Sequence, residues 1–451
     1  MPTRPLAVII LAAGKGTRMR SDRHKVLHPI AGRAMIDYLL KSVAALEPAQ
    51  AVMVVGAQRE QLEKALADRA LTFVVQEEQL GTAHAVLQAE KALAGFDGDV
   101  LLLSGDVPFV RPETMRTLLT ALDGDDAPAA AVMGFRPADP AAYGRILADA
   151  DGRVRRMVEY KDASPDERAV GLCNANLFAV RSADLWPLLK RIGNDNAQRE
   201  YYLPDLVTIA LADGRTVRLV EGEPAEATGP NSRAEIALAE AMWQAARRAR
   251  AMAEGATLVA PDTVWFAHDT TLGRDVVIEP YVVFGPGVTL ADGAIVRAFS
   301  HLEGASVAAC EVGPFARLRP GAVLEEGARV GNFVEVKKAT LRRGAKANHL
   351  TYLGDAEVGA GANIGAGTIT CNYDGFFKYR TNIGAGAFIG SNSALVAPVT
   401  VGDGAIVGAG SVVTEDVEAD ALALVRPPQT AKPGWAARFR AAMRARKAQS
   451  H

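Results

Sequence analysis

The sequence predicts two architectures in one chain, an α/β domain and, after a connecting helix, a parallel β-helix. In the first half of the 451 residues, short apolar runs alternate with amphipathic segments. This alternation is typical of a doubly wound sheet with helices on both faces. In the second half, aliphatic residues recur every six positions. We therefore expect domains at 1–231 and 254–451, joined by a helix at 232–253.

The six-residue period runs from Leu272 to Val413. It matches neither the 3.6-residue period of a helix nor the two-residue period of an amphipathic strand. It is typical of a parallel β-helix, in which each hexad forms one short strand and turn, and stacked neighbours bury the aliphatic residue. Chance periodicity does not account for so many residues in phase. They are Leu272, Ile278, Phe284, Leu290, Val296, Leu302, Val312, Leu318, Leu324, Val330, Val336, Val358, Ile364, Ile383, Ile389, Leu395, Val401, Val407 and Val413.

The first buried strand, at residues 6–13, leads into the loop Gly14-Lys-Gly-Thr-Arg-Met19. Its glycines expose backbone N–H groups, and Lys15 and Arg18 add positive charge. Such a loop suits a polyphosphate, although a structural turn is the default interpretation of a bare Gly-rich loop. Further elements are expected as helices at 33–46, 58–67 and from 81, and strands at 51–55, 72–76 and 100–104. Asp106 follows the last strand, where a carboxylate can hold Mg²⁺ or can simply be a solvated turn residue.

Bulk composition limits the function classes. A net charge of −2 gives no reason to expect nucleic-acid binding, and hydrophobic and charged contents of 49% and 23% are ordinary for a globular protein. Three cysteines without metal spacing favour a reducing compartment. The apolar run at residues 6–13 is too short to span a membrane. We expect a soluble cytoplasmic protein without nucleic-acid or membrane partners.

The connecting helix is predicted to begin at a capping box, Ser232-Arg-Ala-Glu235, and to end near Ala253, before Gly255. The basic tail from Arg438 to Lys447 is expected to form a short solvated helix.

Interruptions of the hexad period are the places where function is expected. One polar interruption, between Val336 and Val358, contains His349. A second, between Ile364 and Ile383, inserts residues 372–380. A lone histidine is more often structural than catalytic, but this one lies close in sequence to a lysine and a tyrosine. A neutral imidazole is the usual base near pH 7.

The motifs of the first half occur in the order and spacing of sugar-1-phosphate nucleotidyltransferases. With the β-helix, the whole chain resembles the family of bifunctional N-acetylglucosamine-1-phosphate uridyltransferases and glucosamine-1-phosphate acetyltransferases of bacteria. The resemblance implies a Rossmann-like first domain and a left-handed β-helix. The motifs are Leu11-Ala-Ala-Gly-Lys-Gly-Thr-Arg-Met19, Lys25-Val-Leu27, Gln76, Gln79-Leu-Gly-Thr82, Gly105-Asp-Val-Pro108, Tyr143-Gly-Arg145, Val158-Glu159-Tyr-Lys-Asp162, Asn174, Glu200-Tyr-Tyr202 and Gly229-Pro-Asn231.

For the first domain, the resemblance implies a UTP and UDP-sugar site with Mg²⁺ held by Asp106 and Asn231. The residues implied to bind the nucleotide or sugar are Leu11, Gly14, Lys15, Arg18, Lys25, Gln76, Gly81, Thr82, Ser104, Asp106, Gly144, Glu159, Asn174 and Asn231. Two positions depart from the family pattern. Ser104 stands where relatives carry a bulkier aromatic residue, and Ala175-Asn176 replaces Thr/Ser-Gly, so details of sugar contact are expected to differ.

For the second domain, the resemblance implies that His349 is the base that frees the amine of glucosamine-1-phosphate. That substrate is expected to contact Arg319, Lys337, Tyr352 and Asn363. Acetyl-CoA is expected to contact Ala366, Asn372, Tyr373, Ser391, Ala409 and Arg426. The resemblance also implies a homotrimer that supplies UDP-N-acetylglucosamine for peptidoglycan and lipopolysaccharide.

Two alternatives remain open on the sequence. The chain could be a monofunctional nucleotidyltransferase whose β-helix regulates or oligomerises it, or a structural protein with two degenerate sites. His349, Lys337 and the insertion at Asn372-Tyr373 argue against the first, and Lys25, Asp106 and Asn231 argue against the second.

Overall fold

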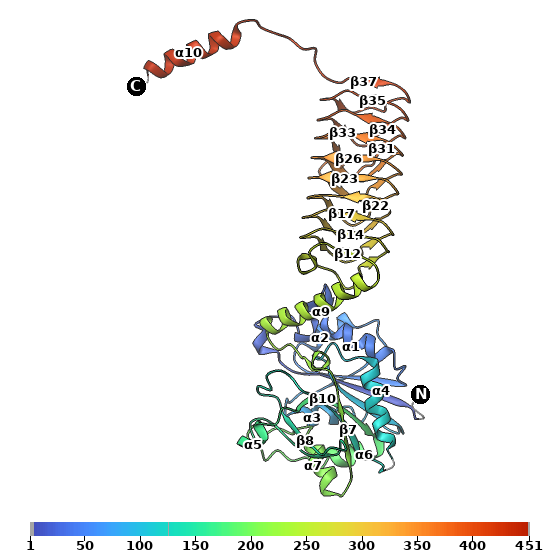
Figure 1. Ribbon diagram of the computed structural model, residues 1–451, viewed down its shortest axis with the longest axis vertical. Coiled ribbons are helices and arrows are strands. Elements are labelled where there is room, and N and C mark those ends of the chain that lie inside the picture. Colours follow the sequence, from blue (N-terminus) through green and yellow to red (C-terminus); the bar gives the residue numbers. More distant parts are fainter. Residues whose placement is uncertain (1–3, 125, 450–451) are drawn as a thin grey trace. The chain divides into compact units, whose positions relative to one another are not determined.

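The structure is a computed structural model that describes residues 4–124 and 126–449. It divides into two compact units, Met1–Ala246 and Arg247–His451. The first unit contains a mixed sheet in the order β11-β7-β10-β6-β1-β4-β5, with β8 and β9 attached to β10 (Figure 1). The strands are β1 (Leu6–Ala12), β4 (Gln50–Val55), β5 (Thr72–Val75), β6 (Asp99–Ser104), β7 (Ala130–Phe135), β8 (Arg145–Ala148), β9 (Val154–Val158), β10 (Cys173–Arg181) and β11 (Val217–Glu221). A small hairpin pairs β2 (Pro29–Ile30) with β3 (Arg33–Ala34).

Helices cover both faces of this sheet, because successive strand residues point to opposite sides. Ile9 of β1 belongs to the apolar core beneath α3 (Thr82–Leu87), α6 (Ser182–Leu189) and α7 (Asp205–Ala212). Its neighbours Val8 and Ile10 belong to the opposite core, beneath α1 (Met35–Ala44), α2 (Arg59–Ala65) and α4 (Pro112–Thr120). The doubly wound arrangement is confirmed, but the sheet is not all parallel. β10 pairs antiparallel with β6 and β7, and β8 pairs antiparallel with β9 and β10.

Strand order reverses around β1, which lies between β6 and β4. The chain passes from β1 to β4 on one side and later returns through β6 on the other. In open α/β sheets such a switch leaves a crevice beyond the carboxyl ends of the strands. Here the crevice lies after β1 and β6, where residues 13–18 and 105–106 follow the strands.

The long helix α9 (Arg233–Ala253) carries residues of both units. Its N-terminal part packs Ala239 against Ile30 and Met35 of the first unit. In the second unit, Arg247 donates to the carbonyl of Thr270 at 3.0 Å. The short helices α5 (Pro165–Arg168) and α8 (Pro224–Ala227) lie in loops of the first unit. None of the described helices is long and apolar enough to cross a membrane.

The second unit is a parallel β-helix with three faces, numbered here in the order in which each coil visits them (Figure 1). Face 1 comprises β12 (Thr257–Leu258), β14 (Val277–Ile278), β17 (Ile295–Val296), β20 (Glu311–Val312), β23 (Arg329–Asn332), β26 (Lys346–His349), β29 (Asn363–Ile364), β32 (Phe388–Ile389), β35 (Ile406–Val407) and β37 (Leu422–Ala423). Face 2 comprises β15 (Val283–Phe284), β18 (His301–Leu302), β21 (Arg317–Leu318), β24 (Glu335–Lys337), β27 (Tyr352–Gly354), β30 (Ile369–Cys371), β33 (Ala394–Val396) and β36 (Val412–Val413). Face 3 comprises β13 (Thr271–Leu272), β16 (Thr289–Leu290), β19 (Ala305–Val307), β22 (Ala322–Leu324), β25 (Thr340–Leu341), β28 (Ala356–Val358), β31 (Thr381–Ile383) and β34 (Val399–Val401).

The hexad residues point inward as expected, and all of them except Leu272 are buried. The prediction that the β-helix is interrupted between Val336 and Val358 is wrong. The coil continues through β25, β26 and β27, with Leu341, Ala347 and Leu353 as its buried residues. Five-residue steps before Leu341 and after Leu353 shift the phase, so a search for strict hexads misses these strands. The second expected interruption is a true insertion, since residues 372–380 leave the coil between β30 and β31.

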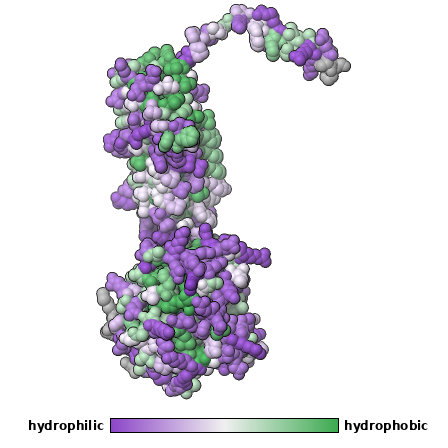
Figure 2. Space-filling view, turned by 180° about the vertical axis from the view of Figure 1, so that it is seen from behind, coloured by the Kyte–Doolittle hydropathy of each residue, from purple (hydrophilic) through white to green (hydrophobic). Residues whose placement is uncertain are grey.

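The corner between faces 1 and 2 carries a column of exposed aromatic rings. Tyr281, Phe299, Phe315 and Phe333 occupy successive coils, with ring centroids 5.0, 4.9 and 5.4 Å apart. Each has a positive φ between 56° and 60°, so the chain turns the corner through the left-handed region. Leu350, at φ 50°, continues the column directly after His349. The surface of the β-helix therefore mixes hydrophobic with hydrophilic patches, as Figure 2 shows for one side.

The tail forms a helix, as expected, but a longer one. It is α10 (Trp435–Gln449), and none of its residues is buried.

Candidate functional sites

The Gly-rich loop after β1 forms one wall of a cavity of about 330 Å³. Gly16 lies at φ 58°, and a Cβ there would stand 2.9 Å from the Cβ of Lys25. Only glycine fits this close approach at low cost. The cavity lining includes several residues that the sequence nominated: Leu11, Gly14, Lys15, Arg18, Lys25, Asp106 and Asn231.

The ammonium of Lys25 joins the two expected metal ligands. It donates to Oδ2 of Asp106 and, at 2.6 Å, to Oδ1 of Asn231. Burial alone raises the pKa of the Asp106 carboxyl, but the charge and hydrogen bond of Lys25 outweigh it, so the pKa lies below its usual value. Ser104 donates to the other oxygen, Oδ1, at 2.7 Å. Two side-chain oxygens, one from Asp106 and one from Asn231, thus converge on one cation. Oxygen atoms of this kind are the ligands that Mg²⁺ prefers.

Asn231 is held by the start of α9. Its backbone N–H donates to Oε2 of Glu235 at 2.8 Å, and the Glu235 N–H donates to Oγ of Ser232 at 3.3 Å. The expected capping box is therefore half formed, because the Glu235 carboxylate reaches the residue before Ser232. Sequence reasoning identified the cap but missed its role in fixing Asn231.

Gln76 lies near Lys15 and is hydrogen-bonded to Gly81. Gln76 and Lys15 line a second cavity, of about 340 Å³. The Gln76 amide donates to the carbonyl of Gly81 at 3.1 Å. Gly81 has φ 118°, and a Cβ there would lie 2.5 Å from the carbonyl oxygen of Tyr201. Thr82 accepts the N–H of Leu203 through Oγ1 at 2.9 Å, so its hydroxyl also anchors this segment.

The expected sugar-binding residues Gly144, Glu159 and Asn174 are brought together by β8, β9 and β10. Asn174 N–H donates to the Gly144 carbonyl at 2.9 Å. A Cβ on Gly144 would stand 3.3 Å from Oε1 of Glu159. Burial, followed by the charges of Asp205, Asp162 and Glu200, raises the pKa of Glu159, which lines a third cavity of about 380 Å³.

The substituted segment after Asn174 has a structural explanation. Asn176 lies at φ 57°, a region that glycine and, among other residues, asparagine enter most readily. Its side-chain oxygen Oδ1 accepts from Nδ2 of Asn174 at 2.8 Å, and its backbone N–H donates to Oδ1 of Asn174 at 2.9 Å. Asparagine therefore suits this backbone conformation, and it also orients Asn174.

In the second unit, one corner collects His349 and three expected acetyl-CoA residues. Backbone hydrogen bonds link successive coils there, from Gly367 N–H to Leu350, from Asn392 N–H to Ala366 and from Gly410 N–H to Ser391. Arg426 donates to the carbonyl of Ala409 at 2.5 Å in the next coil. The residues brought together along this corner are His349, Ala366, Ser391 and Ala409. Asn363 begins β29, the strand that leads into Ala366.

A cationic cluster lies at the far edge of face 2. The Lys378 ammonium, which contacts Lys337, and then the charge of Arg319 lower the pKa of Lys337. Arg319 is anchored by Glu335, with Nη1 and Oε1 2.8 Å apart. Tyr352 pairs in register with Glu335 on this face. Three neighbouring cations have the charge that binding of a phosphate requires. Lys378 was missed by the sequence analysis, because only the folded insertion brings it to Lys337.

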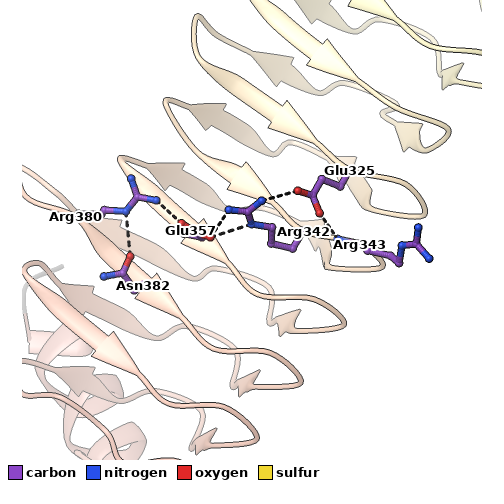
Figure 3. Close-up of polar contacts among 6 residues, drawn as sticks. All are labelled: Glu325, Arg342, Arg343, Glu357, Arg380 and Asn382. Atoms are coloured by element: carbon purple, nitrogen blue, oxygen red, sulfur yellow. Dashed lines mark hydrogen bonds and ion pairs between the residues drawn. The ribbon is translucent and has the colours of Figure 1, made fainter.

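The insertion at 372–380 is tied to the coil at both ends. At its start, buried Asn372 donates to Oδ2 of Asp355 at 2.5 Å, while Tyr373 stays exposed. At its end, Arg380 donates to Glu357 at 2.5 Å and to Asn382 at 3.0 Å (Figure 3). Glu357 also accepts from Arg342, which continues the ion pairs across the neighbouring coil.

Comparison with known proteins agrees with both halves. Residues 8–164 match the model of the MobA-like NTP transferase domain, and 269–304 and 380–415 match that of the bacterial transferase hexapeptide (six repeats). The chain is 65% identical to the "Bifunctional protein GlmU" of Sphingopyxis alaskensis over 98% of both chains. It is 66% identical to that of Novosphingobium aromaticivorans, over 99% of both chains. The corresponding protein of Zymomonas mobilis is 56% identical, over 97% of this chain and 98% of its own.

The chain belongs to the bifunctional GlmU family. The family expected from the motifs, that of bifunctional uridyltransferases and acetyltransferases, is thereby confirmed. The α/β domain and the hexapeptide β-helix are confirmed with it. The alternatives of a monofunctional nucleotidyltransferase and of a purely structural protein are not supported, because relatives named as bifunctional match nearly the whole chain.

Proposed function

We propose that this chain makes UDP-N-acetylglucosamine in two steps. The second unit acetylates glucosamine-1-phosphate, and the first unit transfers a uridylyl group from UTP to the product. The observation that carries the proposal is that each unit has its own polar site. One is the Lys25–Asp106–Asn231 cluster, and the other combines the His349 corner with the cations beside Lys337. Such a product feeds bacterial peptidoglycan and lipopolysaccharide synthesis.

In the first unit, the sugar-phosphate oxygen attacks the α-phosphorus of UTP in line, and pyrophosphate leaves. This chemistry needs positioning and charge neutralisation more than a protein nucleophile. Lys15, Arg18 and the glycine amides of the loop bind the phosphates. Gly144, Glu159 and Asn174 hold the sugar. Lys25 lies at the centre, where its charge meets the reacting phosphate.

We propose that Asp106 and Asn231 hold Mg²⁺. Their oxygens already converge on one positive charge, that of Lys25, and one of the Asp106 oxygens is oriented by Ser104. When bound, Mg²⁺ neutralises the charge on the phosphate oxygens.

In the second unit, Arg319, Lys337 and Lys378 bind the phosphate of glucosamine-1-phosphate, and Tyr352 and Asn363 contact the sugar. The amine nitrogen attacks the thioester carbonyl of acetyl-CoA. His349 takes the amine proton as the N–C bond forms and the C–S bond breaks. Asn372, Tyr373 and the corner residues Ala366, Ser391, Ala409 and Arg426 hold the coenzyme.

We also propose a homotrimer assembled through the β-helix and located in the cytoplasm. The exposed aromatic column at the corner of faces 1 and 2 supports the assembly, because contiguous exposed apolar surface marks interaction sites. Light scattering tests it, and a monomeric mass at working concentration would contradict it. The three free cysteines are compatible with a reducing compartment.

One assay tests the two activities together. Purified protein receives glucosamine-1-phosphate, acetyl-CoA, UTP and Mg²⁺, and each component is omitted in turn. We expect acetyl transfer to require neither UTP nor Mg²⁺, whereas pyrophosphate release from N-acetylglucosamine-1-phosphate requires both. Pyrophosphate release without any acetyl transfer would leave only a nucleotidyltransferase and contradict the proposal.

A further inference from the structure

Asn332 and His349 occupy matching positions in neighbouring coils. Asn332 ends β23 and His349 ends β26, and the two residues are register partners on face 1. Oδ1 of Asn332 and Nδ1 of His349 lie 2.8 Å apart. The side chains therefore form a hydrogen bond between two neighbouring coils. The bond lies at the corner that also carries the expected coenzyme residues.

The main chain around His349 is held independently of this bond. Leu350 N–H donates to the backbone carbonyl of Asn332 at 3.1 Å. The hydroxyl of Thr351, a residue only 3% exposed, donates to the carbonyl of His349 at 2.8 Å. Both bonds fix the peptide group that joins His349 to Leu350 but leave rotation of the imidazole ring free. The carboxamide of Asn332 fixes the ring.

We propose that Asn332 is a positioning residue for acetyl transfer, acting through His349. This inference rests on the proposed role of His349 as the base. A carbonyl oxygen only accepts a hydrogen bond, so a neutral imidazole bonded to Oδ1 carries its proton on Nδ1. The lone pair then lies on Nε2, and the hydrogen bond selects this tautomer over the other.

The tautomer matters because the base must accept a proton at the start of the step. Nε2 accepts the proton from the attacking amine, while the thioester C–S electron pair leaves with the coenzyme sulfur. Donation of that proton to the sulfur releases the coenzyme as a thiol and restores the neutral imidazole. With the opposite tautomer, Nε2 would carry a hydrogen and could not accept another.

Two substitutions distinguish positioning from a structural role. Asn332→Ala removes the acceptor, and we expect kcat for acetyl transfer to fall about 10- to 100-fold, with an unchanged KM for acetyl-CoA. This loss is part of the roughly 10²- to 10⁴-fold that a general base supplies. Asn332→Asp keeps an acceptor and cannot donate, so it should retain most of kcat at alkaline pH. The acidic limb of the kcat–pH profile of this variant should move to higher pH, because a carboxylate stabilises the imidazolium.

A double-mutant cycle with His349→Ala gives the control. If Asn332 acts only through the imidazole, Asn332→Ala adds no further loss in the His349→Ala background. Asn348→Ala, which removes the neighbouring carboxamide on β26, should leave kcat unchanged. Thermal unfolding and pyrophosphate release of each variant show that the chain is folded.

Several outcomes would overturn the inference. An Asn332→Ala enzyme with wild-type kcat, an Asn332→Asp enzyme as slow as Asn332→Ala at every pH, or additive losses in the double mutant would each do so. Full acetyl transfer by His349→Ala alone would instead refute the proposed base, whatever Asn332 does.

Discussion

Lys25 donates through its ammonium to Oδ1 of Asn231 at 2.6 Å, although 206 residues separate the two in the chain. This bond joins the segment between β1 and β2, which carries Lys25, to the segment before α9, which carries Asn231. Asp106 completes the group from the end of β6. Three distant segments thus converge on the switch point of the sheet, where parallel strands leave a crevice.

Removing the Asp106 carboxylate is expected to separate the two activities. Asp106→Ala should lower pyrophosphate release by about 10²- to 10³-fold or more, the loss typical of deleting one strong electrostatic contact to a reacting group. Acetyl transfer should continue at its normal rate. Asp166→Ala, at an exposed position of α5, removes the same charge and serves as the control. Simultaneous loss of both activities in Asp106→Ala would contradict independent sites.

Inorganic phosphate is expected to stabilise the protein through the cations around Lys337. The pKa of Lys337 is lower in the folded state, because its charged form is repelled by Lys378 and Arg319. This repulsion destabilises the fold at pH values below that pKa, and the destabilisation disappears as the lysine loses its proton at higher pH. Phosphate offsets this repulsion at neutral pH. At ~100 times its Kd, binding adds about 2.7 kcal/mol and raises the Tm.

Lys378→Ala should weaken this phosphate effect and should raise the KM for glucosamine-1-phosphate more than it lowers kcat. Lys432→Ala, in the exposed tail, is the matched control. Calorimetry in phosphate, against potassium chloride of equal ionic strength, measures the difference. Equal stabilisation of Lys378→Ala and wild type would exclude Lys378 from the anion site.

The Arg380–Glu357 pair is expected to act on substrate binding more than on stability. Arg380→Ala frees one end of the insertion that carries Asn372 and Tyr373. Exposed ion pairs contribute about 0.2–1 kcal/mol, so we expect the KM for acetyl-CoA to rise by about two- to fivefold with little change in Tm. Arg343→Ala removes an exposed pair with Glu326 that does not reach the insertion, and its KM should not change. A KM shift of the same size in both variants would argue against the anchor.

Gly81→Ala should destabilise the first unit severely. At φ 118° the alanine is strained, and its Cβ would meet the Tyr201 carbonyl oxygen at 2.5 Å. The combined cost is about 2–5 kcal/mol. Gly95 has φ 76° with open space around its Cβ position, so Gly95→Ala should cost only the conformational part, about 1–2 kcal/mol. Urea unfolding compares the two, and equal destabilisation would mean that the close approach to Tyr201 costs nothing.

The sequence by itself determined the class of each half. A six-residue aliphatic period fits a coil with one short strand and corner per hexad, so the β-helix followed from spacing alone. The order of glycines, cations and the aspartate after β6 identified the family and nominated the candidate site residues, because these motifs are local.

Contacts between distant coils were decided only by the tertiary structure. The hexad pattern says which residues face inward, but five-residue steps around Leu341 and Leu353 shift the phase, and the coil there was mistaken for an interruption. Lys378 reaches Lys337 only because the insertion folds back, and Asn332 reaches His349 only because β23 and β26 pair in that register. Register and strand order depend on the packing of the whole unit, and a local pattern of residues does not contain them.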